Sequence, residues 1–547
     1  MEYNQGKNET AASIEPSQQT SRSKKPILIS LAVIVLLGIG TTVYAMFFNL
    51  SPKETYFLAE KNSMEQTQES FNKTFAVNED VNEKMMKDPS KSTLTLGLKS
   101  IEGLGAIDPN MAMFASMLND VKLSMAAQLN PEKNEGLAEL KAGMGGTEFI
   151  KAEAYQSEDL TALNVPLLYN NYLYLNNDQF GEVMKKIEPA YQGPEQIDNF
   201  VEMQLEAMKN QGKYEEHAEE YGKFLHEKIK DENVTEKSGV EFQGNKYNQL
   251  TLQLSEQETK EILKALIDKV QKDDELIDLL IDTNVNTALN TQGMETADLK
   301  ETFQTELKNA SENIDQIKIP DGFKSVILVD NKDVIVKRDV DFKIGAESEL
   351  VVVDYSSHAL RSDDIITDGK WEINIFPENG EKQDYVKVLL EIKGKKGEGE
   401  NATRDITGAF AFAEAGEVTG ANLNAKITGA PEDMKADFEA SIEDPNNSGI
   451  PPLKGHFTRK VTDDLDNGTY ASNGEFGLEV DAGLGAPINV TFDYENKTEF
   501  TDNLKFPNVA EDGENVAEMS PEEMQNIMMD IQTRIQGMMK NGPQMFK

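Results

Sequence analysis

The chain has 547 residues, of which 96 are acidic and 54 basic, so that its formal net charge is −42, and it contains no cysteine. Such an acidic chain repels nucleic acid and anionic lipid headgroups, which excludes functions that rely on a basic surface. Without cysteine there is neither a disulfide framework nor a thiolate metal site.

Residues 26–48 form an uncharged apolar run, Pro26 to Phe48. As a helix the run would extend about 34 Å at about 1.5 Å per residue, enough to cross a hydrocarbon core of about 30 Å. Arg22, Lys24 and Lys25 precede it, so the positive-inside rule leaves residues 1–25 as a disordered cytoplasmic tail. We therefore expect a single-pass cell-membrane protein that contacts the lipid bilayer through residues 26–48, with the C-terminal region extracellular.

An alternative is cleavage after Ala45, since Val43-Tyr44-Ala45 has the small-x-small form of a signal-peptidase site. The apolar run continues through Phe48, past that site, which favours an uncleaved signal anchor. A large external region without disulfides is common in exported proteins of Gram-positive bacteria, so we expect a bacterial source.

The external region begins with a predicted juxtamembrane helix in residues 49–90, ended by Asp88-Pro89-Ser90. Residues 91–320 predict an α+β half. Its strands alternate apolar and polar residues over 121–129, 137–144, 147–155, 168–176 and 247–254, with a helical block from 177 to about 230. A Ser-x-x-Glu capping box at Ser255–Glu258 predicts the start of the first of three further helices before Pro320.

Residues 321–510 predict a β-rich half of roughly eight to ten antiparallel strands, each with one dry and one wet face. The alternation is clearest over 386–392, 434–442, 476–480 and 488–494. Residues 511–547 predict a linker and an amphipathic helix that starts at the cap Ser520-Pro521-Glu522-Glu523. The expected fold is α+β, with curved antiparallel sheets packed with helices and preceded by one transmembrane helix. Two half-barrel-like halves are one arrangement that this pattern allows.

No motif for chemistry emerges from the sequence. His217 and His226 lie nine residues apart, not at the spacing of a zinc helix, and we interpret them as solvated helix-face residues. Runs from Asp282 and Asp463 fail the EF-hand pattern, which leaves irregular carboxylate sites near 363–364 or 463–466 as an alternative to ordinary turns. The segment 394–399 lacks Walker spacing. We predict no catalytic, cofactor-binding or metal-binding residue.

Methionines cluster at Met85, Met86, Met111, Met113 and Met117, and again from Met519 to Met545. Flexible thioethers suit either ordinary core packing or a deformable apolar surface. The nearly uncharged peptide 103–115 is interpreted as a flap over such a surface or as a loop.

Three features are shared with a known group of proteins: the order of signal anchor, long helix and meander, the segment Val165 to Leu175 followed by Asp178 to Gly181, and the strand entering a helix at 250–263. In these features the chain resembles uncharacterised membrane-anchored exoproteins of Bacillus-type bacteria (Firmicutes). That resemblance implies no activity and no site residues. A curved antiparallel sheet with helices on its concave side is also similar to bacterial lipoprotein carriers and lipid carriers, a likeness of fold alone.

We therefore expect a non-catalytic binding or scaffold ectodomain at the boundary of membrane and wall. Its partner would be an apolar or lipid ligand held between sheet and helices, or an envelope protein. The alternatives are an extracellular hydrolase or other envelope enzyme without a recognisable motif, and a sensor, against which the short tail argues. The sequence predicts no oligomeric state.

Overall fold

The computed structural model describes residues 50–541 except 76–77, 108, 289–295, 347–348, 363–364, 379–383, 399–400, 446–449, 482 and 484–485. The expected cytoplasmic tail and the expected span at 26–48 lie outside these residues. Within the described ranges, no helix combines the length and the apolar character that a membrane crossing requires.

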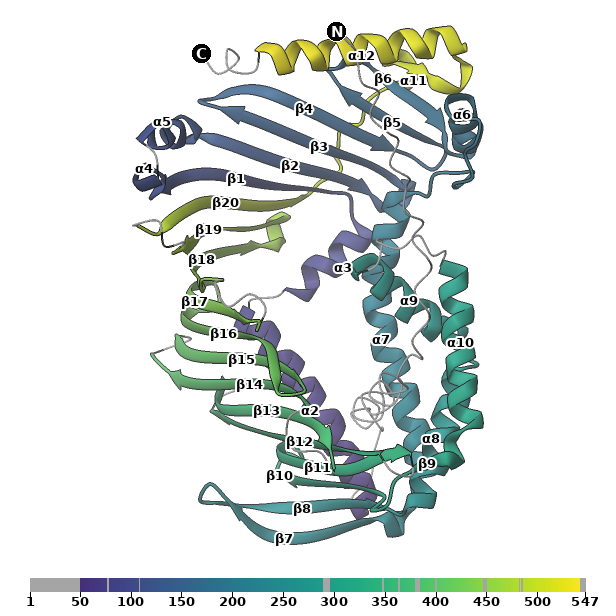
Figure 1. Cartoon of the computed structure of the whole chain (residues 1–547), viewed down its shortest axis with the longest axis vertical. Coiled ribbons are helices and arrows are strands. Elements are labelled where there is room, and N and C mark those ends of the chain that lie inside the picture. Colours follow the sequence, from purple (N-terminus) through teal and green to yellow (C-terminus); the bar gives the residue numbers. More distant parts are fainter. Residues whose placement is uncertain are drawn as a thin grey trace, which may run out of the picture.

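One curved, unclosed antiparallel sheet dominates the molecule, and Figure 1 shows it as a C-shaped wall with helices across its open side. From one edge to the other, the order is β6 to β1 in descending number, then β20 to β10 in descending number, then β8 and β7. The described strands are β1 (Ser90–Glu102), β2 (Val121–Asn130), β3 (Glu135–Met144), β4 (Thr147–Gln156), β5 (Leu160–Val165), β6 (Tyr169–Asn176), β7 (Val234–Phe242), β8 (Asn245–Leu254), β9 (Ile317–Lys318), β10 (Phe323–Val329), β11 (Ile335–Ala346), β12 (Glu349–Ser362), β13 (Ile365–Pro377), β14 (Tyr385–Lys396), β15 (Ala402–Glu414), β16 (Glu417–Ala430), β17 (Asp433–Glu443), β18 (Leu453–Asp464), β19 (Thr469–Val480), β20 (Ile488–Phe500) and β21 (Gly513–Asn515).

Strands from both predicted halves share this sheet, because β1 pairs with β20 from Ser90↔Phe500 to Glu102↔Asn489. The expectation of an α+β fold with a curved antiparallel sheet is confirmed, but the strands form one open sheet instead of two half-barrels. The described part of the 321–510 half holds eleven strands, β10 to β20, slightly more than the eight to ten expected. Short β21 adds to the edge strand β6 in parallel.

The chain path follows from that central pairing. It enters the sheet in the middle at β1, meanders to the β6 edge, and crosses to the opposite edge through the long helix α7 (Phe200–Lys228). Strands β7, β8 and β10 to β20 then lead back to β1. At about 1.5 Å per residue α7 extends roughly 44 Å, long enough to connect the two arms of the sheet.

The remaining helices lie mainly against the concave side, apart from those at the upper end (Figure 1). They are α2 (Pro52–Phe75), α3 (Glu79–Lys87), α4 (Leu104–Ile107), α5 (Pro109–Leu118), α6 (Phe180–Ile187), α8 (Glu256–Val270), α9 (Asp274–Ala288), α10 (Thr296–Glu312), α11 (Val509–Asp512) and α12 (Pro521–Asn541). The main core packs α2 and α7 to α10 against β7 to β13, with Tyr56, Phe57, Leu250, Ile277 and Phe342 almost fully buried.

The strands present one apolar and one polar face, as the alternation predicts. In β17, Met434, Ala436 and Phe438 point to the concave side and Lys435 and Asp437 to the outside. Cross-strand pairing carries the same assignment from strand to strand, since directly paired residues lie on the same face.

Three local expectations need correction. The juxtamembrane helix predicted in residues 49–90 is interrupted: α2 ends at Phe75, and Asn78 caps a separate α3 by accepting the Asp80 amide. The peptide 103–115, interpreted as a flap or a loop, is not an irregular loop, because helix α4 and most of helix α5 lie in its described part. Strands β5 and β7 were not expected, because β5 is short and β7 is a largely exposed edge strand whose residues are mostly polar.

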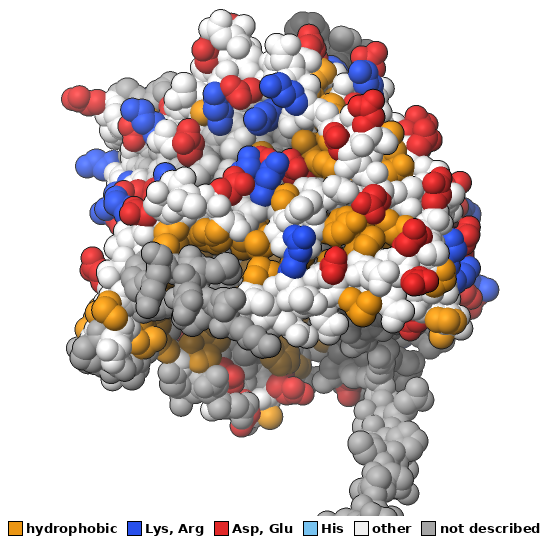
Figure 2. Space-filling model, turned by 90° about the horizontal axis from the view of Figure 1, so that it is seen from above, with side chains coloured by type: hydrophobic (Ala, Val, Ile, Leu, Met, Phe, Trp, Pro, Cys, Tyr) orange, Lys and Arg blue, Asp and Glu red, His pale blue; other side chains and the backbone are white. Residues whose placement is uncertain are grey.

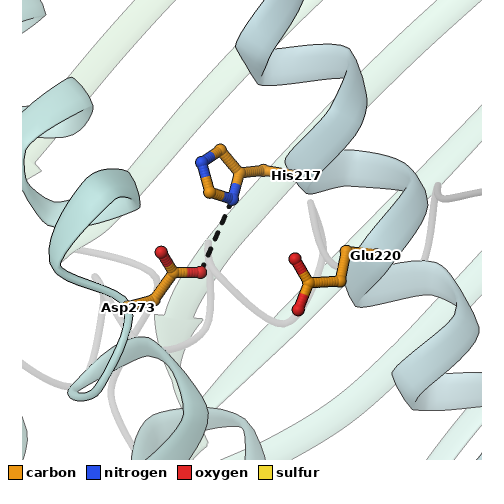
Figure 3. A group of neighbouring side chains, drawn as sticks. All are labelled: His217, Glu220 and Asp273. Atoms are coloured by element: carbon orange, nitrogen blue, oxygen red, sulfur yellow. Dashed lines mark ion pairs between the residues drawn. The ribbon is translucent and has the colours of Figure 1, made fainter.

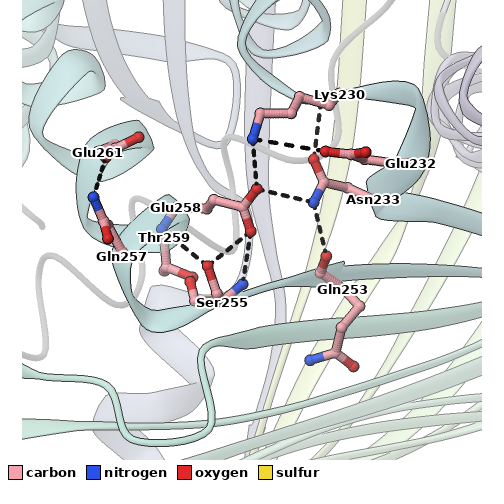
Figure 4. A network of polar contacts seen from close by, with 9 residues as sticks. All are labelled: Lys230, Glu232, Asn233, Gln253, Ser255, Gln257, Glu258, Thr259 and Glu261. Carbon is pink, nitrogen blue, oxygen red and sulfur yellow. Dashed lines mark hydrogen bonds and ion pairs between the residues drawn. The ribbon is translucent and has the colours of Figure 1, made fainter.

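The predicted capping box at the start of α8 is confirmed (Figure 4). Ser255 Oγ accepts the Glu258 amide at 3.3 Å, and Glu258 accepts the Ser255 amide at 3.1 Å. Lys230 Nζ, 3.0 Å away, and the Asn233 amide group also donate to this carboxylate. The hydrogen bonds from Ser255 and Lys230 lower the pKa of Glu258 to about 2. The cap therefore ties the start of α8 to the turn before β7.

Replacing Ser255 by alanine should destabilise the protein by about 1 kcal/mol, the usual loss for an N-cap. Urea unfolding followed by the fluorescence of Trp371, the single tryptophan, measures it. Ser520→Ala is the matched control, because the same box caps α12, of which Met524 alone is buried among residues 521–538. Equal losses in the two variants would contradict the view that α8, and not α12, belongs to the main cooperative core.

Candidate functional site

Six large apolar side chains of the concave face remain exposed on β14 to β17. We call this group the apolar patch; each member is between 39% and 55% exposed, and the members are Val388, Leu390, Phe410, Phe412, Leu423 and Ile442. The pairing places them in adjacent rows: Val388 lies opposite Phe410, which lies opposite Ala421, and Ala421 lies opposite Ile442. The patch is thus contiguous across four strands.

The patch exists because the helices cover only part of the concave face. The main core ends at Ile375 on β13 and the partly buried Val386 on β14. Two residues further along β14, Val388 and then Leu390 are exposed. Trp371 on β13 lies directly opposite Leu390, so the single tryptophan stands at the border between the covered core and the apolar patch.

Stacked aromatic rings extend this apolar face towards the centre of the sheet. Phe438 stacks on Phe476 with ring centroids 6.3 Å apart, and Phe457 on Tyr494 with centroids 5.6 Å apart. Glycine makes room for the first pair: a Cβ on Gly455 would lie 2.3 Å from Cζ of Phe438. Beyond the centre, a second group on the same face is 37% to 56% exposed, namely Met125, Leu140, Ile150 and Leu163.

Hydrophobic side chains also gather in bands, among acidic and basic ones, on the end of the molecule seen from above (Figure 2). Figure 1 places β6 and α12 at this end. On α12, Met524 is buried, whereas Met528 and Ile535 are exposed. Met111 and Met113 of α5 are likewise exposed, so a part of the methionine clusters is surface and not core.

Arg338, Arg404 and Arg459 lie on the concave face, in register with apolar neighbours. Arg338 forms a buried ion pair with Glu60 of α2, and Tyr56 donates to Ser325 Oγ at 2.8 Å beside it. Burial works to lower the pKa of Arg338, but the adjacent Glu60 charge raises it overall. This cluster fixes α2 on β10 and β11.

Arg459 Nη2 donates to the carbonyl of Pro431 at 3.2 Å, and this side chain has further contacts. Arg404 differs from both. It is only 7% exposed, yet no carboxylate or hydrogen-bond acceptor pairs with its guanidinium in the part of the chain that the structure describes. Burial alone lowers the pKa of Arg404 from its ordinary value.

Arg338→Met should destabilise the protein by about 3–5 kcal/mol, because it leaves the carboxylate of Glu60 buried without a cation. Replacing both partners, Glu60→Leu with Arg338→Met, should recover most of that loss. Urea unfolding of the two variants measures the difference. If the double variant were no more stable than Arg338→Met, the penalty would not come from the unpaired charge.

The interpretation of His217 and His226 as solvated residues is wrong. Figure 3 shows His217 and Glu220 of α7 facing Asp273, in the turn between α8 and α9, and their ligand-type atoms lie within 4.8 Å of one another. His217 Nδ1 is 3.5 Å from Asp273 Oδ2, which also accepts the Tyr221 hydroxyl at 3.0 Å. Glu220 is paired with Lys269.

His217, Glu220 and Asp273 could offer three ligand atoms to a metal ion. Both carboxylates already have protein partners, however, and these contacts join α7 to α8 and α9. A helix-to-helix tether explains the cluster without an ion, and we assign it no metal.

His226 packs edge-on against Phe57, with ring centroids 5.2 Å apart, and burial lowers the pKa of His226 below its ordinary value of about 6.5. Between the folded-state pKa and about pH 6.5, the unfolded chain binds a proton that the folded chain does not, so stability falls as the pH drops through this range. In His226→Gln this contribution should disappear. Denaturation midpoints between pH 7.5 and 5 for both proteins measure it; identical slopes would contradict a buried neutral imidazole.

The carboxylate loops considered for calcium contain no assembled site among the described residues. Residues 363–364 lie outside them. In the 463–466 turn, Asp463 accepts the Leu465 amide and Asp464 the Asn467 side chain, as in ordinary turns. A cleft of about 590 Å³ beside β5 and β6 has several acidic side chains, but its asparagines and Gln156 bind backbone groups that fix the start of α7.

Neither the apolar patch nor Arg404 was recognised in the sequence. The sequence of β15 did contain a signal for Arg404. Side chains alternate between the two faces of a strand, and this places an arginine on an otherwise apolar face with Ala402, Ile406, Gly408 and Phe410.

No family model matches the chain, and no curated protein matches it either. The resemblances described above therefore remain expectations.

Proposed function

We propose that the chain is a non-catalytic single-pass membrane protein whose external region binds a lipid on the apolar patch. The observation that carries the proposal is the contiguous exposure of six large apolar side chains on the concave face of the sheet. Scattered exposed apolar residues are normal on a soluble protein, whereas a contiguous concave group is typical of a binding surface.

The contrast between the two sheet faces supports an apolar ligand. Behind the patch, the outer face of β14 to β16 carries Lys387, Glu391, Asp405 and Lys426, alternating with the patch residues. An acyl chain on the concave side would remove apolar surface from water at about 25 cal/mol per Å², and would need no catalytic group.

The expected anchor would bring the patch near its ligand. Phe48 is four residues before Pro52, the first residue of α2, and Lys53 of α2 lies 3.5 Å from Asp231, just before β7. If residues 26–48 span the bilayer, the β7 arm of the sheet stands next to the membrane surface.

Trp371 offers a local reporter, because it lies in the same cross-strand row as Leu390, Gly408 and Leu423. Lipids with brominated acyl chains quench tryptophan only at short range. We expect them to quench Trp371 of the full-length chain in nonionic detergent micelles, relative to the unbrominated lipid. The anchor contains no tryptophan, so lipid around it does not contribute.

Leu423→Glu should strongly reduce this quenching, since a carboxylate in the patch must be desolvated when the acyl chain binds. Asn424→Glu is the matched control: it places the same charge one residue further along β16, on the outer face, and should leave the quenching unchanged. Absence of quenching in the wild-type chain, or equal loss in both variants, would refute the proposal and direct the search to a protein partner.

A further inference from the structure

Arg404 is a buried cation whose charge no described residue balances. Its side chain is 7% exposed, and it belongs to no ion pair or hydrogen bond among the described residues, whereas the equally inward Arg338 has Glu60. Burying an unpaired charge is costly, so a protein that keeps one usually uses it to bind an anion.

The position of Arg404 relates it to the apolar patch. It lies on β15 between Gly394 of β14 and Ile427 of β16, on the same face as Phe410. The nearest members of the patch, Leu390 and Leu423, lie in the cross-strand row of Gly408, four residues or about 13 Å from Arg404 at about 3.3 Å per residue. A lipid leaflet is roughly 15 Å thick, half of a hydrocarbon core of about 30 Å. An acyl chain with its headgroup at Arg404 therefore reaches the patch.

The path between Arg404 and the patch is open at Gly408. A Cβ at this position would have its nearest neighbour, the Cβ of Leu423, only at 3.8 Å, so no side chain fills the space above the backbone here. The exposed Leu390 and Leu423 flank Gly408 on the neighbouring strands. Gly408 therefore leaves the backbone between these two side chains without a side chain of its own, in line with Arg404 along β15.

We propose that Arg404 binds the phosphodiester group of an acidic phospholipid whose acyl chains lie on the apolar patch. This inference rests on the proposed function and names its ligand class. A guanidinium matches a phosphate with two parallel hydrogen bonds, and one arginine balances the single charge of a phosphodiester.

The width of the patch favours a lipid with two chains. Its members extend over four strands, β14 to β17, hence three spacings of about 4.8 Å. Two acyl chains in van der Waals contact fill this width, whereas one chain leaves much of it exposed.

The net charge of the chain makes a local cation necessary. At −42 the protein repels acidic headgroups over most of its surface. An acidic phospholipid is therefore held only where positive charge is concentrated and screened from this field, as at the buried Arg404.

The test compares two brominated lipids with identical chains, phosphatidylglycerol and the neutral diacylglycerol, as quenchers of Trp371 in the full-length chain in nonionic detergent. We expect the phospholipid to act at lower concentration than the diacylglycerol. In Arg404→Met its half-maximal concentration should rise about tenfold, the loss of one charge-assisted hydrogen-bonded contact, with no change for the diacylglycerol. Arg404→Lys should lie between, and Arg534→Met on exposed α12 should resemble the wild type.

Thermal unfolding without lipid separates a binding role from a structural one. Since Arg404→Met removes an unbalanced buried charge, its melting temperature should rise; a fall would show that the arginine supports the fold and would overturn the inference. An unchanged phospholipid titration in Arg404→Met, or equal titrations of both lipids in the wild type, would also overturn it while leaving lipid binding intact. Failure of both lipids to quench the wild-type chain would overturn the proposed function itself.

Discussion

The pairing of β1 with β20 is the contact on which the rest of the structure depends. It joins the first and last long strands of the described chain along their full length, from Ser90↔Phe500 to Glu102↔Asn489. Without it the two arms would be separate sheets, connected by the chain through α3, through α7 and through the segment between β20 and β21. With this pairing the two arms form one sheet, and the inward-facing side chains of both arms line one continuous concave face.

Helix cover divides this surface into two parts with different roles. Over β7 to β13, α2 and α7 to α10 close the core, and the inward arginine Arg338 is paired there with Glu60. Over β14 to β17 the six large side chains of the apolar patch are left exposed, and Arg404, the inward arginine of this region, has no ion-pair or hydrogen-bond partner among the described residues. The same strand pattern thus yields a core where helices cover it and a candidate binding surface where they do not.

Local physics made much of this fold predictable. Period-two alternation located most strands and their faces, and Ser255–Glu258 and Ser520–Glu523 located two helix starts, because each depends on residues a few positions apart. Strand neighbours were not predictable: nothing near Ser90 indicates a partner as distant as Phe500. The site was missed for the same reason. Alternation assigns Val388 and Leu390 to a dry face, but only the tertiary placement of the helices decides which parts of that face stay uncovered.

The central pairing also dictates an order of assembly. β1 is the first strand of the described chain, yet the neighbour on one of its sides is β20, which is synthesised after every other strand of the sheet except the short β21. Until then β1 presents a free hydrogen-bonding edge, and the inward faces of β1 to β6 lack the continuation of their apolar surface. Sheet formation by this chain is therefore dominated by contacts of very long range, which fold slowly, and its completion must wait for residues near its end.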